Sequence, residues 1–194
     1  MRHALLLSTL VSLTALAAPW EIDSSHASAT FSVKHFGVSN VNGTLGPVTG
    51  MVELDDADPS KGKIDATIDV KAIDTKWPKR DEHLRSADFF EVDKFPSMTF
   101  KSTKIVKVSK TKLKVTGDLT IHGVTKPVTL DAEVSPEIKN PFSGNPVRAV
   151  TASALINRQD FGLKWQAPAE AVKVVGDEVK VAIELELVQK PAAK

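Results

Sequence analysis

Cysteine is absent from the 194-residue sequence. The chain therefore cannot form a disulfide, and it must be held together by the packing of its core. Thiol catalysis, zinc–thiolate sites and iron–sulfur clusters are excluded for the same reason. An excess of charge is absent too, because 25 Lys and Arg face 24 Asp and Glu. This balance gives no electrostatic reason to expect nucleic acid or an anionic membrane surface as a partner.

Long apolar runs are missing beyond the first residues of the chain. Met1–His3 carries a positive charge, Ala4–Leu16 is mostly apolar, and Ala15-Leu16-Ala17 has the small-x-small pattern that signal peptidase recognises. The apolar run is shorter than the roughly 20 residues that a membrane-spanning helix needs. Residues 1–17 are therefore predicted to be a cleavable signal peptide, with a buried N-terminal helix as the alternative. Residues 18–194 are predicted to be one exported, periplasmic domain without a transmembrane segment.

Motifs for catalysis and metal binding are also lacking. The sequence contains no G-x-S-x-G, P-loop, H-E-x-x-H or G-x-G-x-x-G pattern. His26, His35 and His122 lack the short spacing of zinc ligands, and Asp23 beside His26 is better explained as a pair of solvated turn residues. No catalytic residue, metal site or cofactor is therefore predicted.

The main positive signal is the alternation of apolar and polar residues. It runs through 64–71, 112–121, 128–134 and 179–187. Successive side chains of a strand point to opposite faces, so each run predicts a strand with one wet and one dry face. Turn signals such as His122-Gly123 separate the runs and indicate about eight antiparallel strands. Closure of about eight strands leaves an interior wide enough for side chains or one slender ligand.

Lysines dominate one stretch, from Lys101 to Lys114. The stretch is interpreted as a solvated strand face punctuated by Val and Ile. It is not a nucleic-acid site, because no aromatic residues interleave with the lysines.

One segment, residues 75–94, interrupts the alternation. Pro78 can begin a helix in its first turn, and Trp77 and Leu84 would then share one helical face. Ser86 can cap a short second turn beginning at Ala87. The segment is predicted to form one or two short helices over a mouth of the barrel.

Four stretches occur in an order and spacing typical of one known family. They are residues 20–37, 79–100, 117–128 and 157–163, the last with the sequence Asn-Arg-Gln-Asp-Phe-Gly-Leu. In this arrangement, which extends over about residues 20–188, the chain resembles the YceI-like polyisoprenoid-binding family. The resemblance implies an all-β fold, an extended lipocalin-like barrel of eight antiparallel strands with a short helical insertion.

The resemblance also implies a function. A polyisoprenoid, an isoprenoid quinone or a similar long-chain lipid would lie along the apolar interior of a carrier or sequestering protein that is not an enzyme. Members of this family are typically small and exported, and homodimers are known, so a homodimer is a further expectation. Membership supports the fold more firmly than the physiological role.

An apolar tail has nothing to hydrogen-bond, so a dry, elongated cavity must recognise it. About fifteen buried carbons at roughly 0.8 kcal/mol each would supply about 12 kcal/mol before association costs are deducted. The competing interpretation is a solidly packed core. Small residues at candidate inward positions, such as Ala66, Gly117 and Ala132, favour a cavity. The residues predicted to contact the ligand are Phe31, Val33, Ile68, Phe89, Phe90, Phe100, Leu119, Ile121, Phe161 and Trp165.

Four basic side chains are candidates for holding a polar head group, such as a phosphate or a quinone oxygen. In the structural alternative, two of them form ion pairs that pin the insertion against the barrel. The candidates are Arg80, His83, Arg85 and Arg158, and the two pairs of the alternative are Arg85–Asp88 and Arg158–Asp160.

Two other functions are compatible with the same fold. A small enzyme could act on a lipid-like substrate in the cavity, with His83 and either Asp81 or Glu82 as an acid–base pair. A partner-binding module could instead use the ends of the barrel as an interface, and a filled interior would favour that function.

Overall fold

The computed structural model describes residues 19–166 and 173–189. The predicted signal peptide, residues 1–17, lies outside these ranges. No helix within them is long and apolar enough to cross a membrane.

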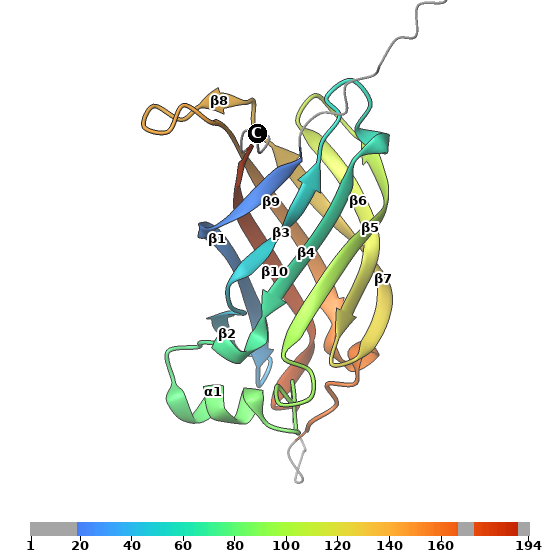
Figure 1. The fold of residues 1–194 in the computed structure, drawn as a ribbon. Helices are drawn as coiled ribbons and strands as arrows, with labels where there is room; N and C mark the ends of the chain where they lie inside the picture. Colours follow the sequence, from blue (N-terminus) through green and yellow to red (C-terminus); the bar gives the residue numbers. More distant parts are fainter. Residues whose placement is uncertain (1–18, 167–172, 190–194) are drawn as a thin grey trace, which may run out of the picture.

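Eight strands close into an antiparallel barrel (Figure 1). They are β1 (Trp20–His35), β3 (Val48–Glu53), β4 (Lys63–Asp69), β5 (Ser97–Lys107), β6 (Lys112–Ile121), β7 (Val124–Val134), β9 (Pro146–Asn157) and β10 (Val175–Val188). The order around the barrel is β10-β1-β3-β4-β5-β6-β7-β9, and pairing of β9 with β10 closes the circle. The predicted eight-stranded barrel with a helical insertion is thereby confirmed.

Alternation along the strands decides which side chains face inward. In β6, Val115, Leu119 and Ile121 are buried while Lys114 and Asp118 are exposed, as the period of two requires. The turn to β7 has φ of +50° at His122 and +74° at Gly123. Positive φ at both central residues is the backbone of a type I′ turn, which matches the twist of a two-residue hairpin. The hairpin predicted at these two residues is confirmed.

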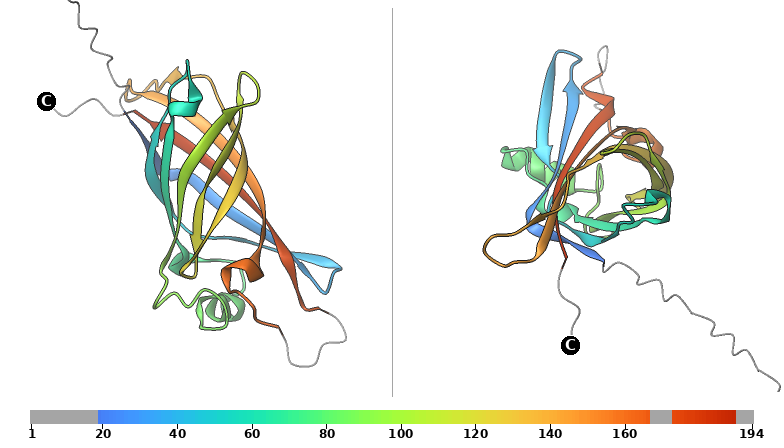
Figure 2. Two further views of the ribbon diagram at one scale, coloured as in Figure 1. Left: turned by 90° about the vertical axis from the view of Figure 1, so that its right-hand side faces the viewer. Right: turned by 90° about the horizontal axis from the view of Figure 1, so that it is seen from above.

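Along one edge, the long strand β1 pairs with two different strands, one at its start and one at its end. Trp20 and Glu21 pair with β3, whereas Thr30–His35 pairs with β2 (Ser39–Thr44), which stands outside the circle. Its other edge follows β10, with a register shift between Ile22 and Ala27 where residues 23–26 bulge outward. Figure 2 shows β1, β2 and the start of β10 projecting from the wall of the barrel.

A helix and turns cover the lower end of the barrel (Figure 1). Helix α1 (Pro78–Arg85) begins at Pro78, as predicted, because proline fits the first helical position. The prediction that Trp77 and Leu84 share a helical face is wrong. Trp77 precedes the helix with extended backbone and is 60% exposed, while Leu84 packs against the core.

The segment after α1 forms turns rather than a second helix. The carbonyl of Ser86 accepts hydrogen bonds from the amides of Phe89 and Glu91, and Glu91 has a left-handed φ of +47°. A left-handed residue cannot continue a right-handed helix, so the second turn ends at once. Short 3₁₀ turns lie at Pro59–Lys61, Val70–Ala72 and Arg158–Phe161.

A projecting arm leaves the upper end of the barrel. It comprises β8 (Ile138–Lys139) and the turn that leads into β9, and β8 pairs only with the first residues of β9 in the described chain. Figures 1 and 2 show the arm standing away from the barrel wall, at the end opposite α1.

Candidate ligand-binding site

The barrel contains two apolar chambers. The upper chamber, toward the end opposite α1, has a volume of about 100 Å³, and the lower chamber, beside α1, has about 90 Å³. The upper chamber is lined by Val48, Val52, Leu54, Pro59, Ile64, Ala66, Ile68, Met98, Thr99, Phe100, Ile105, Leu113, Val115, Leu119, Leu130, Ala132, Val134, Val150, Ala152, Ile156, Val181, Ile183 and Leu185. The lower chamber is lined by Phe31, Val33, Leu45, Leu84, Phe89, Phe90, Met98, Ile121, Ile156, Arg158, Leu163, Val175, Val179 and Val181.

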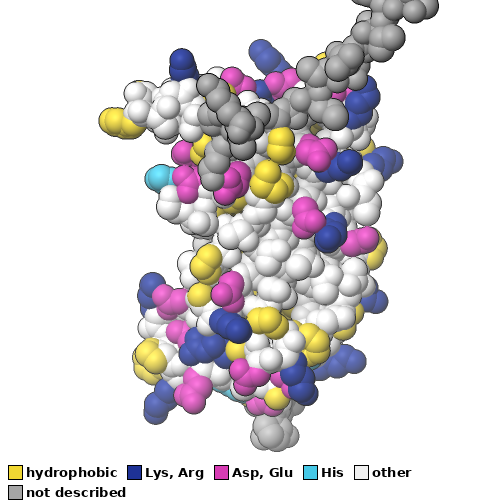
Figure 3. Space-filling model, in the orientation of Figure 1, with side chains coloured by type: hydrophobic (Ala, Val, Ile, Leu, Met, Phe, Trp, Pro, Cys, Tyr) yellow, Lys and Arg dark blue, Asp and Glu magenta, His cyan; other side chains and the backbone are white. Residues whose placement is uncertain are grey.

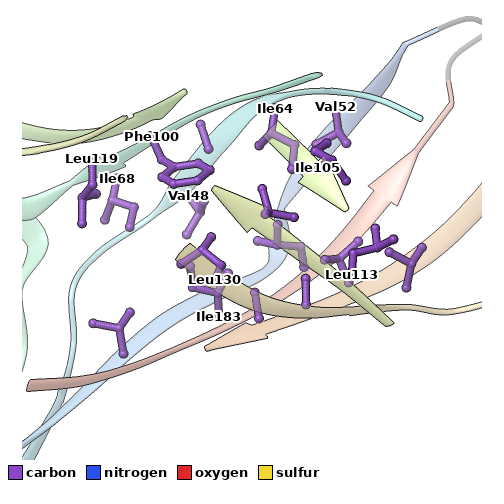
Figure 4. A pocket seen from close by; sticks show the side chains of 18 of the residues that line it. Val48, Val52, Ile64, Ile68, Phe100, Ile105, Leu113, Leu119, Leu130 and Ile183 are labelled. Carbon is purple, nitrogen blue, oxygen red and sulfur yellow. The ribbon is translucent and has the colours of Figure 1, made fainter. Parts of the chain in front are cut away.

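The upper chamber is apolar because the inward positions of neighbouring strands carry apolar side chains. Thr99 is the one polar residue among those that line it. Figure 4 shows Val48 and Phe100 facing Leu130 and Ile183 across the interior, with carbon atoms alone on the side chains. Such a surface can bind a hydrocarbon, but it cannot read hydrogen-bonding groups.

Gly117 was expected to leave space for a ligand in this chamber, but the ring of Phe100 fills that space. A Cβ added to Gly117 would lie 2.4 Å from Cζ of Phe100, because the phenyl ring lies over the glycine. The missing side chain of Gly117 therefore accommodates Phe100 rather than a ligand. Ala66, Ala132 and Ala152 do line the chamber, as the small-residue argument expected.

Three residues belong to the walls of both chambers: Met98, Ile156 and Val181. Met98 is only 4% exposed. Its side chain is unbranched and has three rotatable bonds, whereas Ile156 and Val181 are β-branched and stiff. Met98 is thus the most adaptable part of the partition between the chambers.

The ten residues predicted to contact a ligand are distributed over both chambers. Phe161 is 2% exposed and lies in the core outside either lining, and Trp165 packs at ring-centroid distances of 5.0 Å from His83 and 5.5 Å from Phe89. Contact with a ligand remains a prediction for all ten. The other eight line a chamber: Ile68, Phe100 and Leu119 the upper one, and Phe31, Val33, Phe89, Phe90 and Ile121 the lower one.

Sequence reasoning missed much of the lining. Val48 and Val52 occupy inward positions of β3, but the strand is short and Gly50 lies between them, so the alternation is weak. Val181 and Leu185 lie in a clear alternating run and were recognisable as inward positions. The sequence does not show which strands pair with β10, and so it does not show which side chains these two residues face across the barrel.

The predicted head-group residues on the insertion bond to the chain itself. Arg80 donates to the hydroxyl and the carbonyl of Thr75 at 2.7 and 3.0 Å, and Arg85 donates to the carbonyl of Ile73 at 3.3 Å. The buried carboxylate of Asp81 accepts from the amide of Thr75 at 2.8 Å. These contacts tie α1 to the segment that immediately precedes it, residues 73–75. Binding of a head group by these residues remains a prediction.

His83 has a partner other than those expected. Its Nε2 lies 2.8 Å from a carboxylate oxygen of Asp88, and its ring contacts Phe89 edge-on at 5.0 Å. The acid–base hypothesis placed His83 with Asp81 or Glu82, but Asp81 is bonded to Thr75. The structural alternative paired Asp88 with Arg85, whereas Asp88 faces His83 here.

Arg158 is a buried charge at the floor of the lower chamber. It is 4% exposed, and its guanidinium donates to the carbonyls of Gly176 (2.9 Å), Trp165 (3.1 Å), Val175 (3.3 Å) and Leu163. Its ion pair is with Asp177 at 3.4 Å, and not with Asp160 as the structural alternative expected. Among the described residues, these carbonyls and the carboxylate of Asp177 compensate the buried charge.

The opposite end of the barrel, here called the rim, holds a polar cleft of about 430 Å³. The rim cleft is lined by charged side chains and shares Leu54, Pro59, Leu113 and Val134 with the upper chamber. Across the rim, Arg148 pairs with Asp56 through two hydrogen bonds of 2.6 and 2.5 Å. This contact lowers the pKa of Asp56 and raises that of Arg148. No sequence signal indicated the cleft.

At the bulge in β1, three titratable side chains lie close together. One potential metal-ligating atom from each of Asp23, His26 and Glu186 lies within 4.8 Å of the other two. Hydrogen bonds from Ser25 and then from His26 lower the pKa of Asp23 to about 2, and the Asp23 carboxylate raises the pKa of His26. The pairing of β1 with β10 supplies Glu186, which the local Asp23–His26 spacing could not reveal.

Comparison with known proteins agrees with this architecture. Residues 20–187 match the model of the YceI-like domain. The chain belongs to the YceI-like domain family. This YceI-like chain is 39% identical to Protein YceI of Shigella flexneri over 171 residues, which are 84% of the chain and 88% of that relative.

Solved structures of YceI-like proteins share the barrel. The crystal structure of the Campylobacter jejuni YCEI protein superimposes with a TM-score of 0.69 at 29% identity, covering 98% of this chain and 100% of that one. A polyisoprenoid binding domain from Saccharophagus degradans, implicated in plant cell wall breakdown, superimposes with a TM-score of 0.64 at 15% identity, covering 88% and 98%. At that identity the second likeness shows the fold alone.

Proposed function

We propose that this YceI-like protein is an exported, non-catalytic carrier that holds a polyisoprenoid, an isoprenoid quinone or a similar long-chain lipid in its barrel. The observation that carries the proposal is the pair of adjoining apolar chambers, in which Thr99 and the internally bonded Arg158 are the only polar residues among the described ones that line them. The structural relative described as a polyisoprenoid binding domain supports the ligand class. Export is proposed from the leader-like residues 1–17.

The two volumes set the scale of the ligand. A water-sized group takes up about 30 Å³ in a liquid. Volumes of about 100 and 90 Å³ therefore give each chamber room for roughly three such groups. A tail of about fifteen carbons, which supplies about 12 kcal/mol gross, exceeds the two chambers together. Binding such a tail requires the partition at Met98 to move and the interior to widen.

The test is extraction of the purified protein with organic solvent, followed by mass spectrometry. The expected result is one long-chain lipid at close to one molecule per chain, from the native host and from a recombinant host. A chain that carries no lipid from either host, and binds none when prenols of graded length are offered, contradicts the proposal.

A filled-interior variant makes the test specific to the chambers. Ala132 and Ala152 pair across β7 and β9 and both line the upper chamber, so A132L/A152L fills space without adding a polar group. We expect this variant to lose the bound lipid while remaining folded. Leu155→Ala, on the outer face of β9 where the side chain is 62% exposed, is the matched control and should retain the lipid.

A further inference from the structure

The hairpin between β5 and β6 carries unpaired positive charge at the rim. Lys104, Lys107, Lys110 and Lys112 are exposed, and none of them forms an ion pair within residues 19–166 and 173–189. The lysine stretch therefore differs along its length, because Lys101 and Lys114, nearer the barrel wall, pair with Asp65 and Asp131 at 3.1 and 2.7 Å. Residues 102–113 contain no acidic side chain.

Several carboxylates lie near this hairpin, and each accepts a hydrogen bond or forms an ion pair; Glu133, opposite Lys112 in the β6–β7 register, accepts from the hydroxyl of Thr111 at 2.9 Å. Asp56 and Glu137 both contact the guanidinium of Arg148, at 2.5 and 3.7 Å. Asp55 accepts hydrogen bonds from the amides of residues 57 and 58 at 2.9 and 2.8 Å. These carboxylates keep their negative charge, but the hairpin itself carries four exposed lysines and no acidic residue over 102–113, so its tip is locally positive.

Exposed apolar side chains accompany these lysines. Val106 and Val108 on the hairpin are 43% and 58% exposed, and Ile138 and Phe142 on the projecting arm are 63% and 98% exposed. Figure 3 shows a hydrophobic side chain at the outer tip of the arm and Lys or Arg side chains along the upper edge of the molecule. Lysines interleaved with apolar side chains are typical of surfaces that bind the interface of a bilayer.

The two projections flank the rim cleft, which adjoins the upper chamber. The rim cleft is lined by Lys107 and Lys110 from the hairpin and by Pro136 and Glu137 from the base of the arm. Its inner wall is shared with the upper chamber. A surface that contacts both tips therefore lies directly over the cleft.

We propose that the rim docks on the surface of an anionic lipid bilayer, with the four lysines at the lipid phosphates and Val106, Val108 and Phe142 in the interfacial layer. The inference rests on the proposed carrier function, because a carrier exchanging lipid through this end must bring the cleft to a membrane. An acidic protein would satisfy the lysines, but the separate apolar tips do not form the continuous patch that a protein interface needs. Each lysine at such a surface favours binding by about fivefold, and the attraction falls with salt.

Sedimentation with vesicles tests the docking surface. The probes are vesicles of phosphatidylcholine alone and of phosphatidylcholine with phosphatidylglycerol, at low and high salt. We expect wild-type protein to bind the anionic vesicles at low salt, to lose binding at high salt, and to leave the neutral vesicles unbound. K107E/K110E should bind at least about 25-fold more weakly, and Phe142→Ser should bind a few-fold more weakly.

The matched control is K79E/K164E, which makes the same change of charge on exposed lysines at the α1 end. This variant should bind the anionic vesicles as the wild type does. Equal losses of vesicle binding in the two double variants, or no binding of the wild-type protein to anionic vesicles, would overturn the inference. Circular dichroism spectra of both variants serve to check that they are folded.

A separate measurement distinguishes this inference from the carrier function. Wild-type protein that binds a prenol in solution but no vesicle leaves the carrier function standing and overturns the docking inference. Protein that binds anionic vesicles through the rim lysines but takes up no prenol supports the docking surface and removes the carrier function.

Discussion

The two ends of the barrel are built from different interactions. At the α1 end, the guanidinium of Arg158 is buried and bonded to backbone carbonyls, and the carboxylate of Asp81 is buried against Thr75. At the rim, Arg148, whose side chain is 10% exposed, pairs with Asp56, whose side chain is 71% exposed, and lysines stand in solvent. Buried polar networks are costly to break, whereas exposed ion pairs are worth little. From this comparison we expect the lower end to resist opening more strongly than the rim does.

The largest effect is expected at the α1 end. Arg158→Met removes the donor for the carbonyls of Leu163, Trp165 and Gly176 and leaves them without that partner. Breaking one side of a buried charged network costs about 3–5 kcal/mol, so the urea midpoint should fall strongly. Lys164→Met, on the exposed surface of the same loop, is the control and should change stability by less than about 0.5 kcal/mol. A loss below about 1 kcal/mol for Arg158→Met would mean that the network does not stabilise this end.

The next effect concerns the partition between the chambers. Met98→Ala removes a buried side chain from both walls and should lower the free energy of unfolding by about 2–5 kcal/mol. The same variant joins the chambers, so its preference among prenols should move toward longer tails. Met98→Leu keeps the volume and should cost less than about 1.5 kcal/mol with an unchanged preference. Competition binding with prenols of graded length measures the preference, and an unaltered order in Met98→Ala would exclude Met98 as the partition.

A smaller effect is expected at the rim. Arg148→Gln removes the ion pair with Asp56 and the contact with the Trp20 ring, whose centroid lies 5.2 Å away. Asp56 is largely exposed but the Arg148 side chain is only 10% exposed, so the loss of stability should be about 1–3 kcal/mol, more than a fully exposed ion pair contributes. Release of a bound fluorescent fatty acid should nevertheless become faster, since the pair spans the rim cleft. Release as slow as in the wild type would place the exit elsewhere.

The smallest expected effect is the dependence of ligand release on pH. The hydrogen bond from Arg148 holds the pKa of Asp56 below its ordinary value of 3.8. A carboxyl whose pKa is lowered by folding stabilises the protein above its unfolded pKa, and that stabilisation is lost as the pH falls through the folded value. Ligand release should therefore be constant near neutral pH and accelerate only in acid below 3.8. Asp56→Asn should abolish this acceleration, and a rise of release near neutral pH would contradict the assignment.

The local features of the fold were predictable because a few neighbouring residues decide them. Pro78 begins α1 through its own backbone geometry, and His122-Gly123 adopts the turn that joins β6 to β7. The dry face of β6 follows from its alternation alone. The prediction that Trp77 and Leu84 share a helical face was wrong, because a spacing of seven residues does not show where the helix starts.

The candidate site was predictable only in part. Ile68, Phe100 and Leu119 lie on a chamber wall because inward positions follow from alternation. That the ring of Phe100 would lie over Gly117 could not be inferred, since this depends on the register between β5 and β6. The lysine stretch was visible in the sequence, but the sequence could not show that Lys101 and Lys114 have acidic partners while the lysines between them have none in the described residues.

By itself, the sequence determined the strands, their dry faces, the start of α1 and the family of the chain, all of which depend on local pattern and order. Closure of the barrel decided the partners of Arg158, the approach of Glu186 to Asp23, the partition at Met98 and the position of the lysines beside the rim cleft. The pairing of β9 with β10 and of β10 with β1 brings together groups from opposite parts of the chain. Contacts of that kind depend on register and side-chain length in three dimensions, which no pattern along the chain contains.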